Sequence, residues 1–331
     1  MDPITHITSG ALAGQAVRRK FPARIWLLFC LIAATIPDID NLSGFVSPEF
    51  YLIHHRGITH SFIGGLVAAG AIAALFRVFS RKFPFWWGFL IAYGTIVMHI
   101  FLDLITSYGT QIFSPLTSRR YALPCVFIID PLFTAFLLAA LCASFGWKSK
   151  RTHFAVAGLV WIAIYPMANL GMGLGVRHYA EVQLNHEKIV HQNLHVSPDF
   201  LAPFRWKVIA EDSTTYHIGG VNLLQPGKPL RLEPFHKADM NLLRTLGERA
   251  SMFATYAWFS VYPIMERQKT ADGSSVTFGD LRFYTTFLNR NAGFNNGRMP
   301  FSLTAFFNRE GEFTEYSYMR PGRAKTIQHL E

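Results

Sequence analysis

Long apolar runs fill the first half of the chain, whereas charged, polar and turn residues return at ordinary density from about residue 178. A helix needs about 20 mostly apolar residues to cross a bilayer. Runs that approach or reach this length lie at 62–79, 85–106, 126–146 and 154–175, and a shorter run lies at 24–38. We therefore predict about five transmembrane helices. The segment 4–17 is mildly apolar and too short to cross alone, so we expect a short helix packed beside the bundle.

The second half of the chain has a different pattern, in which β-branched and aromatic residues partly alternate with polar ones. This pattern is typical of strands, and it occurs at 204–212, 214–224, 274–287 and 301–318. Helical periodicity occurs at 236–259. The fold class that we predict is a mainly α membrane bundle followed by an α+β, β-rich domain. We place the membrane domain at 1–176, a helical linker at 177–196 and the second domain at 197–331.

The composition agrees with a membrane protein and argues against two other classes. Half of the residues are hydrophobic and 16% are charged, compared with roughly 25% charged in soluble proteins. The net charge of +10 comes from short basic clusters between apolar runs, a distribution that does not indicate a nucleic-acid partner. The cysteines Cys30, Cys125 and Cys142 show no CxxC spacing and lie in or beside apolar segments, so we expect no disulfide partner for them.

The basic clusters predict the orientation of the helices, because loops rich in Lys and Arg stay in the cytoplasm. These clusters lie at 18–24, 77–82 and 148–151. If all of them are cytoplasmic, the loops 38–61 and 107–125 and the C-terminal domain are extracytoplasmic. Arg119 and Arg120 oppose this orientation but are outnumbered. The N-terminus has no basic stretch before an apolar core, so we expect no cleaved signal peptide.

Ionisable residues gather at the predicted extracytoplasmic ends of the spans, although each costs about 2.5–3.5 kcal/mol inside a bilayer. His99 and Asp103 lie four residues apart, on one face of a helix. A simple His–Asp hydrogen bond or a shared ion would each explain that pair alone. Further residues reach the same level from other segments, namely His6, Asp38, Asp40, His54, His55, His60 and Asp130. Because unrelated structural accidents have no reason to meet at one depth, we predict a shared metal site.

The residue types of this site indicate its chemistry. Imidazole and carboxylate ligands suit Zn²⁺, and also Mn²⁺ or Fe²⁺. The candidates outnumber the four ligands of one structural zinc, which favours two or more ions, or one ion beside a carboxylate base, in an open catalytic site. Our catalytic candidates are Asp40, Arg56 and Asp130. Arg56 could hold a phosphate or carboxylate of a substrate, or equally a lipid headgroup, and His54 is a neighbour of the site rather than a ligand.

The motifs MDPITH, PDID, HRGITHS, HIFLDLITSYGT and FIIDP in combination resemble the YdjM-like family of LexA-regulated, membrane-bound, metal-dependent hydrolases. The resemblance covers about residues 1–175 and extends more loosely to SPDFLAPFRWKVIAED. It implies a polytopic protein of the bacterial inner membrane that carries a hydrolase-type metal site. At the matching positions it implies as metal ligands His6, Asp38, Asp40, His55, His60, His99 and Asp103.

Three functions are compatible with these observations. The first is a hydrolase of a phosphoester, or an ester, in a lipid or lipid-linked substrate at the extracytoplasmic leaflet, because a site at this depth is accessible to headgroups. A more distant similarity to zinc-dependent phospholipases C, which also use His and HxxxD ligands in helices, favours phosphoesters by analogy. The alternatives are a transporter of metal ions or protons and a membrane-anchored binding module with a structural metal.

Overall fold

The computed structural model describes residues 1–331 except 18–22, 271, 288–298, 320–325 and 330–331. Most of the basic cluster expected at 18–24 therefore lies outside the described residues. The chain divides into two compact units. The membrane unit comprises Met1–Ser43, His54–Gly173 and Phe200–Pro203, and the C-terminal unit comprises Gly44–Ile53, Leu174–Asp199 and Phe204–Glu331.

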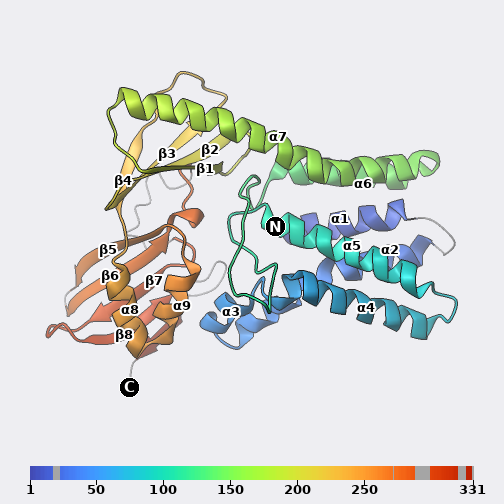
Figure 1. The fold of residues 1–331 in the computed structure, drawn as a ribbon, viewed down its shortest axis with the longest axis horizontal. Helices are drawn as coiled ribbons and strands as arrows, with labels where there is room; N and C mark the ends of the chain where they lie inside the picture. The colour runs from blue at the N-terminus through green and yellow to red at the C-terminus, as the bar shows by residue number, and fades with distance from the viewer. Residues whose placement is uncertain (18–22, 271, 288–298, 320–325, 330–331) are drawn as a thin grey trace. The chain divides into compact units, whose positions relative to one another are not determined.

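Helices make up the membrane unit (Figure 1). Its main helices are α1 (Pro3–Ala16), α2 (Ala23–Thr35), α4 (Phe62–Phe79), α5 (Phe85–Leu104), α6 (Pro131–Gly146) and α7 (Arg151–His186). The shorter elements are η1 (Ile36–Phe45), α3 (Pro48–His54), η2 (Ile58–His60) and η3 (Lys148–Lys150). Most of α3 and the last part of α7 belong to the C-terminal unit.

The described residues contain four helical stretches that are long and apolar enough to cross a membrane: Arg24–Phe45, Phe62–Phe79, Phe85–Leu104 and Lys148–His186. α6 is also apolar but has 16 residues, fewer than the 20 or so that a bilayer requires. It begins late because Pro131 stands in its first turn and the Asp130 side chain accepts the N–H of Phe133. The predicted mainly α membrane bundle is thus confirmed, with four long spans and one shorter helix.

Small residues bring α1 directly against α2. A Cβ at Gly10 would lie 2.4 Å from the Cβ of Ala34, and a Cβ at Gly14 would lie 2.8 Å from the Cα of Leu27. Any side chain at these two positions would push the helices apart. The close contact holds the turn of α1 that carries His6 beside the end of α2.

Two antiparallel sheets form most of the C-terminal unit, and in each of them every strand pairs with its neighbour in sequence. The first sheet contains β1 (Asn193–Pro198), β2 (Arg205–Glu211), β3 (Thr215–Asn222) and β4 (Leu232–His236). The second contains β5 (Pro263–Thr270), β6 (Gly273–Asp280), β7 (Leu303–Phe307), β8 (Phe313–Tyr318) and β9 (Thr326–His329). The chain between the sheets forms α8 (Met240–Arg249) and α9 (Ser251–Phe259), and η4 (Leu281–Phe283) follows β6.

The β-rich character predicted for this part of the chain is confirmed. The strands expected at 204–212 and 214–224 are β2 and β3, and the one at 274–287 contains β6. The segment 301–318 forms two strands, β7 and β8, instead of one. The sequence did not reveal β1, β4, β5 or β9. The first three each contain a proline and lack a clear alternation, and β9 has only four residues.

The helices of this part differ in detail from the expectation. The helix expected at 236–259 is interrupted, because Ala250 leaves helical dihedrals with φ −143° and ψ 108°. In the segment 177–196, expected to be a helical linker, α7 continues to His186 and β1 begins at Asn193.

Candidate metal centre

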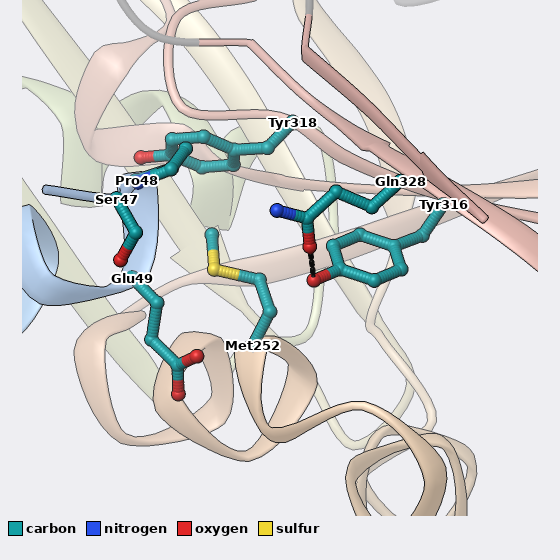
Figure 2. A pocket seen from close by; sticks show the side chains of 7 residues that line it. All are labelled: Ser47, Pro48, Glu49, Met252, Tyr316, Tyr318 and Gln328. Atoms are coloured by element: carbon teal, nitrogen blue, oxygen red, sulfur yellow. Dashed lines mark hydrogen bonds between the residues drawn. The ribbon is translucent and has the colours of Figure 1, made fainter. Parts of the chain in front are cut away.

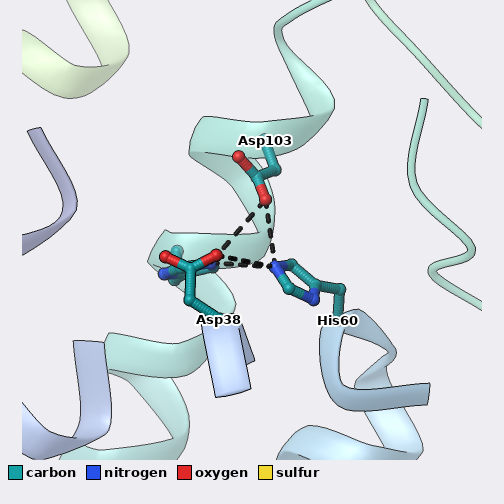
Figure 3. A group of neighbouring side chains, drawn as sticks. Asp38, His60 and Asp103 are labelled. Carbon is teal, nitrogen blue, oxygen red and sulfur yellow. Dashed lines mark hydrogen bonds and ion pairs between the residues drawn. The ribbon is translucent and has the colours of Figure 1, made fainter. Parts of the chain in front are cut away.

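Four side chains of the membrane unit converge from three segments of the chain. Asp38 lies in η1, His60 ends η2, and His99 and Asp103 lie one turn apart on α5. One donor atom of each residue can be chosen so that all four atoms lie within 4.8 Å of one another. Figure 3 shows Asp38, His60 and Asp103 pointing toward a common centre. We call this group the four-residue centre.

Helix boundaries place these residues. α2 ends at Thr35, two residues before Pro37, in keeping with the low helix preference of the residue that precedes a proline. The tighter η1 follows at once and carries Asp38. On the other segment, the Ser61 side chain accepts the N–H of Gly64 at 2.9 Å and caps α4, so His60 stands immediately before that helix.

The donor atoms have the spacing of ligands around one small ion. His60 Nε2 lies 3.1 Å from His99 Nε2, 3.1 Å from Asp103 Oδ2 and 3.6 Å from Asp38 Oδ1. His99 Nε2 lies 3.6 Å from Asp103 Oδ2 and 3.8 Å from Asp38 Oδ1. Four ligands at the corners of a tetrahedral zinc stand roughly 3.3 Å apart, given bonds of about 2.0–2.1 Å. The residues therefore fit a single divalent ion.

The second nitrogen of each imidazole determines which atom faces the centre. His99 Nδ1 lies 2.6 Å from the carbonyl oxygen of Ala34, and His60 Nδ1 lies 2.9 Å from Asp40 Oδ2. A carbonyl and a carboxylate can only accept, so both Nδ1 atoms donate and carry the hydrogen. In the neutral form of each ring Nε2 then presents a lone pair, and the two Nε2 atoms face one another beside two carboxylates. This arrangement of acceptors requires a positive charge between them.

Either a metal ion or a second proton on His60 could supply that charge. Burial lowers the pKa of His60, but hydrogen bonds to Asp103, Asp38 and Asp40 outweigh burial and raise the pKa to about 10. The four-residue centre therefore attracts a cation strongly, and it could hold a metal ion.

The second oxygen of Asp103 faces positively charged groups. Arg56 Nη2 lies 2.9 Å from Asp103 Oδ1, and the amino group of Met1 contacts the same oxygen. Arg56 Nη1 also donates to the Asp103 carbonyl at 3.1 Å and to the Thr106 hydroxyl at 2.9 Å. The Arg56 side chain is only 4% exposed, and its Nε has no partner among the described residues. Arg56 thus orients a ligand carboxylate from within the protein.

His6 lies beside the four-residue centre. Its ring stacks on that of His99 with 3.7 Å between the ring centroids, and its Nε2 lies 3.2 Å from Asp103 Oδ1. Its Nδ1 is buried and has no partner among the described residues. A buried nitrogen without a hydrogen bond is uncommon, because it keeps the cost of losing water. His6 therefore stays available for a further ligand.

Asp40 of the PDID motif contacts the HRGITHS motif, on the side of His60 that faces away from the four-residue centre. Its carboxylate accepts from the backbone N–H of Arg56 at 2.8 Å and from the Thr59 hydroxyl at 2.9 Å, in addition to His60. Its other oxygen lies 3.0 Å from His55 Nδ1. Asp40 and His55 therefore lie next to the four-residue centre, where Asp40 fixes the tautomer and orientation of His60.

Asp130 lies elsewhere in the membrane unit. Its carboxylate caps α6 and accepts the Tyr165 hydroxyl at 2.8 Å. Neither of these two interactions involves a residue of the four-residue centre.

The four-residue centre is open on one side only. The side chains of His60, His99 and Asp103 are at most 1% exposed, whereas that of Asp38 is 29% exposed. Exposed apolar residues lie close to Asp38 in the sequence: Ile39 is 52% exposed and Leu42 is 59% exposed. One of the four side chains is thus accessible from outside, whereas the other three are enclosed by the protein.

The comparisons with known proteins agree with this architecture. The model of the YdjM inner membrane protein family matches residues 1–180, which is more than half of the chain and includes the whole four-residue centre. This chain belongs to the YdjM inner membrane protein family. A relative from Bacillus subtilis (strain 168), named uncharacterized protein YfhP, is 26% identical over 294 residues, which cover 86% of this chain and 87% of the relative. No solved structure matches the chain significantly.

Membership of the YdjM family confirms the predicted family and a place in the membrane. The sequence did not reveal the supporting groups of the centre, which are the Ala34 carbonyl and the hydroxyls of Thr59 and Thr106. Thr59 lies inside the HRGITHS motif next to His60, and Thr106 lies inside the HIFLDLITSYGT motif three residues after Asp103; these positions were the available signals.

Proposed function

We propose that this YdjM family member is a metal-dependent hydrolase that acts on a phosphoester, or an ester, of a lipid or lipid-linked substrate at the extracytoplasmic leaflet. One observation carries the proposal: two imidazole lone pairs and two carboxylates face one another at a site with one accessible side. Zn²⁺ is the metal that we expect, with Mn²⁺ or Fe²⁺ as alternatives.

The residues of the centre and its surroundings have different roles in the proposed hydrolysis. When bound, a divalent ion polarises a phosphoryl or carbonyl oxygen and makes water a better nucleophile at neutral pH. Asp38, His60, His99 and Asp103 would hold the ion, and the unpartnered Nδ1 of His6 offers a further ligand or a hydrogen-bond partner for substrate. Arg56 orients Asp103, and its Nε, which has no partner among the described residues, offers a donor to an anionic substrate.

The surroundings of the open side favour a lipid. Asp38 is the accessible ligand, and Ile39 and Leu42 beside it are more than half exposed. All three lie in the stretch Arg24–Phe45, which is long and apolar enough to span a membrane. A substrate with an apolar part next to its headgroup would match this combination. The orientation toward the extracytoplasmic leaflet follows from the basic clusters of the sequence.

The test is elemental analysis of the purified full chain, prepared without chelator. We expect about one or two equivalents of a transition metal per chain in the wild type, and loss of that metal in His60→Ala and Asp103→Ala. His178→Ala is the matched control, since His178 is exposed on α7. A metal-free wild type, or ligand variants with unchanged metal content, would refute the proposal.

A transport role is separable by a second measurement. The buried charged side chains among the described residues of the membrane unit, apart from Asp130, all belong to the centre or its support: His6, His55, Arg56, His60, His99 and Asp103. An ion path would need polar groups along its whole length. Metal-dependent flux across proteoliposomes, without hydrolysis of phosphodiester lipids, would favour the transporter.

A further inference from the structure

A ten-residue segment of the metal-binding region belongs to the other unit. Residues Gly44–Ile53 are part of the C-terminal unit, whereas the chain up to Ser43 and the chain from His54 are part of the membrane unit. This segment joins the PDID motif to the HRGITHS motif. The two motifs that carry Asp38 and His60 are therefore connected through the C-terminal unit.

Glu49 holds the segment in the C-terminal unit. Its Oε2 accepts the Ser251 hydroxyl at 2.8 Å, and its Oε1 accepts the Thr255 hydroxyl at 2.8 Å. Both hydroxyls lie on α9, one turn apart, so the carboxylate binds this helix with both oxygens. Figure 2 shows Glu49 beside Met252 of the same helix, at a pocket that Tyr316 and Tyr318 of β8 also line.

The segment also contributes apolar side chains. Tyr51 is 7% exposed and Leu52 is fully buried. Burial of these two side chains is favourable because it removes apolar surface from water. The two carboxylate contacts of Glu49 fix the segment to α9 of the C-terminal unit.

The chain between this segment and the metal ligands is short. Three residues separate Asp40 from Gly44, and one residue separates Ile53 from His55. Each residue spans at most about 3.3–3.6 Å, so these short connections leave little slack. A displacement of the segment would therefore also displace Asp40 and His55. Asp40 in turn holds His60 through its Nδ1.

We propose that the C-terminal unit positions the metal ligands through the segment 44–53, with Glu49 as the positioning residue. The inference rests on the proposed metal centre, and it gives the C-terminal unit a role in that centre. A loop held at its middle has fewer conformations to lose when its ligands gather around an ion, so the affinity for the ion rises.

The experiment compares zinc affinity and backbone protection in the full chain in detergent. Zinc affinity is measured by competition with a chelator, and hydrogen exchange is measured over residues 38–60. We expect Glu49→Ala to weaken zinc binding by about 10-fold, the effect typical of groups that orient metal ligands. We expect the same variant to speed exchange over 38–60 even without metal.

Matched variants make the test specific. The pair Ser251→Ala and Thr255→Val removes the same hydrogen bonds from α9, so it should reproduce the effect of Glu49→Ala, and the triple variant should show no further loss. Glu310→Ala, an exposed glutamate of the C-terminal unit, is the control that should leave both readouts unchanged. Exchange over β2 verifies in each variant that the C-terminal unit remains folded.

The experiment distinguishes failure of the positioning role from failure of the metal centre. Wild-type zinc affinity and unchanged exchange in the Glu49 and α9 variants would overturn the positioning role and leave the metal centre intact. A wild type that binds no metal would overturn the proposed function, and exchange over 38–60 in metal-free protein would then decide the positioning role by itself.

Discussion

Buried charged side chains occur in both units, and their partners differ. In the C-terminal unit, Lys207 is 4% exposed, and its ammonium donates to the carbonyls of Leu281 at 2.7 Å, Arg282 at 2.9 Å and Tyr284 at 2.9 Å. Arg282 donates to Asp280 through Nε and Nη2, both at 2.8 Å, and its Nη2 donates to the carbonyl of Phe259 at 2.7 Å. In this group, donors meet acceptors.

In the membrane unit the pattern is reversed. The Nε2 atoms of His60 and His99 lie 3.1 Å apart beside the carboxylates of Asp38 and Asp103. Burial of a charge costs free energy in both units unless a partner compensates it. The C-terminal group supplies acceptors for its charges from within the protein, whereas the four-residue centre gathers acceptors that need a further positive charge, from a metal ion or a second proton on His60. Surplus acceptors, more than burial itself, distinguish the four-residue centre from the C-terminal group.

The largest effect that would test this comparison is a stability effect in the C-terminal unit. Asp280→Ala leaves the buried Arg282 without its carboxylate and removes the acceptor of the Val261 N–H. We expect a loss of about 3–5 kcal/mol in the free energy of unfolding, as for other buried pairs that lose one partner. Chemical denaturation of the full chain measures this loss. Metal content should remain that of the wild type, and a parallel loss of metal would remove the distinction between the two groups.

A smaller effect is expected when a supporting group of the centre changes. Asp40→Asn removes the charge that holds the hydrogen on His60 Nδ1, while it keeps the size of the side chain. We expect metal affinity to fall by about 10- to 100-fold, without loss of stoichiometry at saturating metal. Isothermal titration with Zn²⁺ measures the change. Asp212→Asn, which alters a turn of the C-terminal unit, is the matched control. If Asp40→Asn abolished binding as completely as His60→Ala, Asp40 would itself be a ligand.

Local patterns predicted most of the architecture and the convergence of the motifs. The apolar runs gave the helices of the membrane unit because the length needed to span a bilayer is a local property of the sequence. The spacing of His99 and Asp103 predicted a shared helix face for the same reason. α6 was overestimated because Asp130 and Pro131 start the helix within the apolar run.

The division between ligands and supporting residues was not predictable from the sequence. Asp38 and Asp40 are two residues apart, and in the tighter η1 helix, with three residues per turn, their side chains point in different directions. Asp38 therefore faces His99, while Asp40 faces His55 and the back of His60. Such a difference depends on where η2 and α5 lie in three dimensions, and the sequence of η1 does not contain that information.

The smallest predicted effect is a pH dependence of the C-terminal group. Burial lowers the pKa of Lys207 to about 8, below the 10.5 of an exposed lysine. Between these pH values the unfolded chain binds more protons than the folded chain, so the contribution of Lys207 to stability rises with pH across this window and is flat below it. We expect a gain of about 1 kcal/mol between pH 8 and pH 9 in the wild type relative to Lys207→Met, measured by denaturant unfolding. Lys207→Met also leaves three carbonyls unpaired, but that cost does not depend on pH. Parallel curves of unfolding free energy against pH for the two proteins would contradict this prediction. They would mean that the three carbonyls stabilise the protonated Lys207 as well as water does, so that burial of its charge costs no free energy.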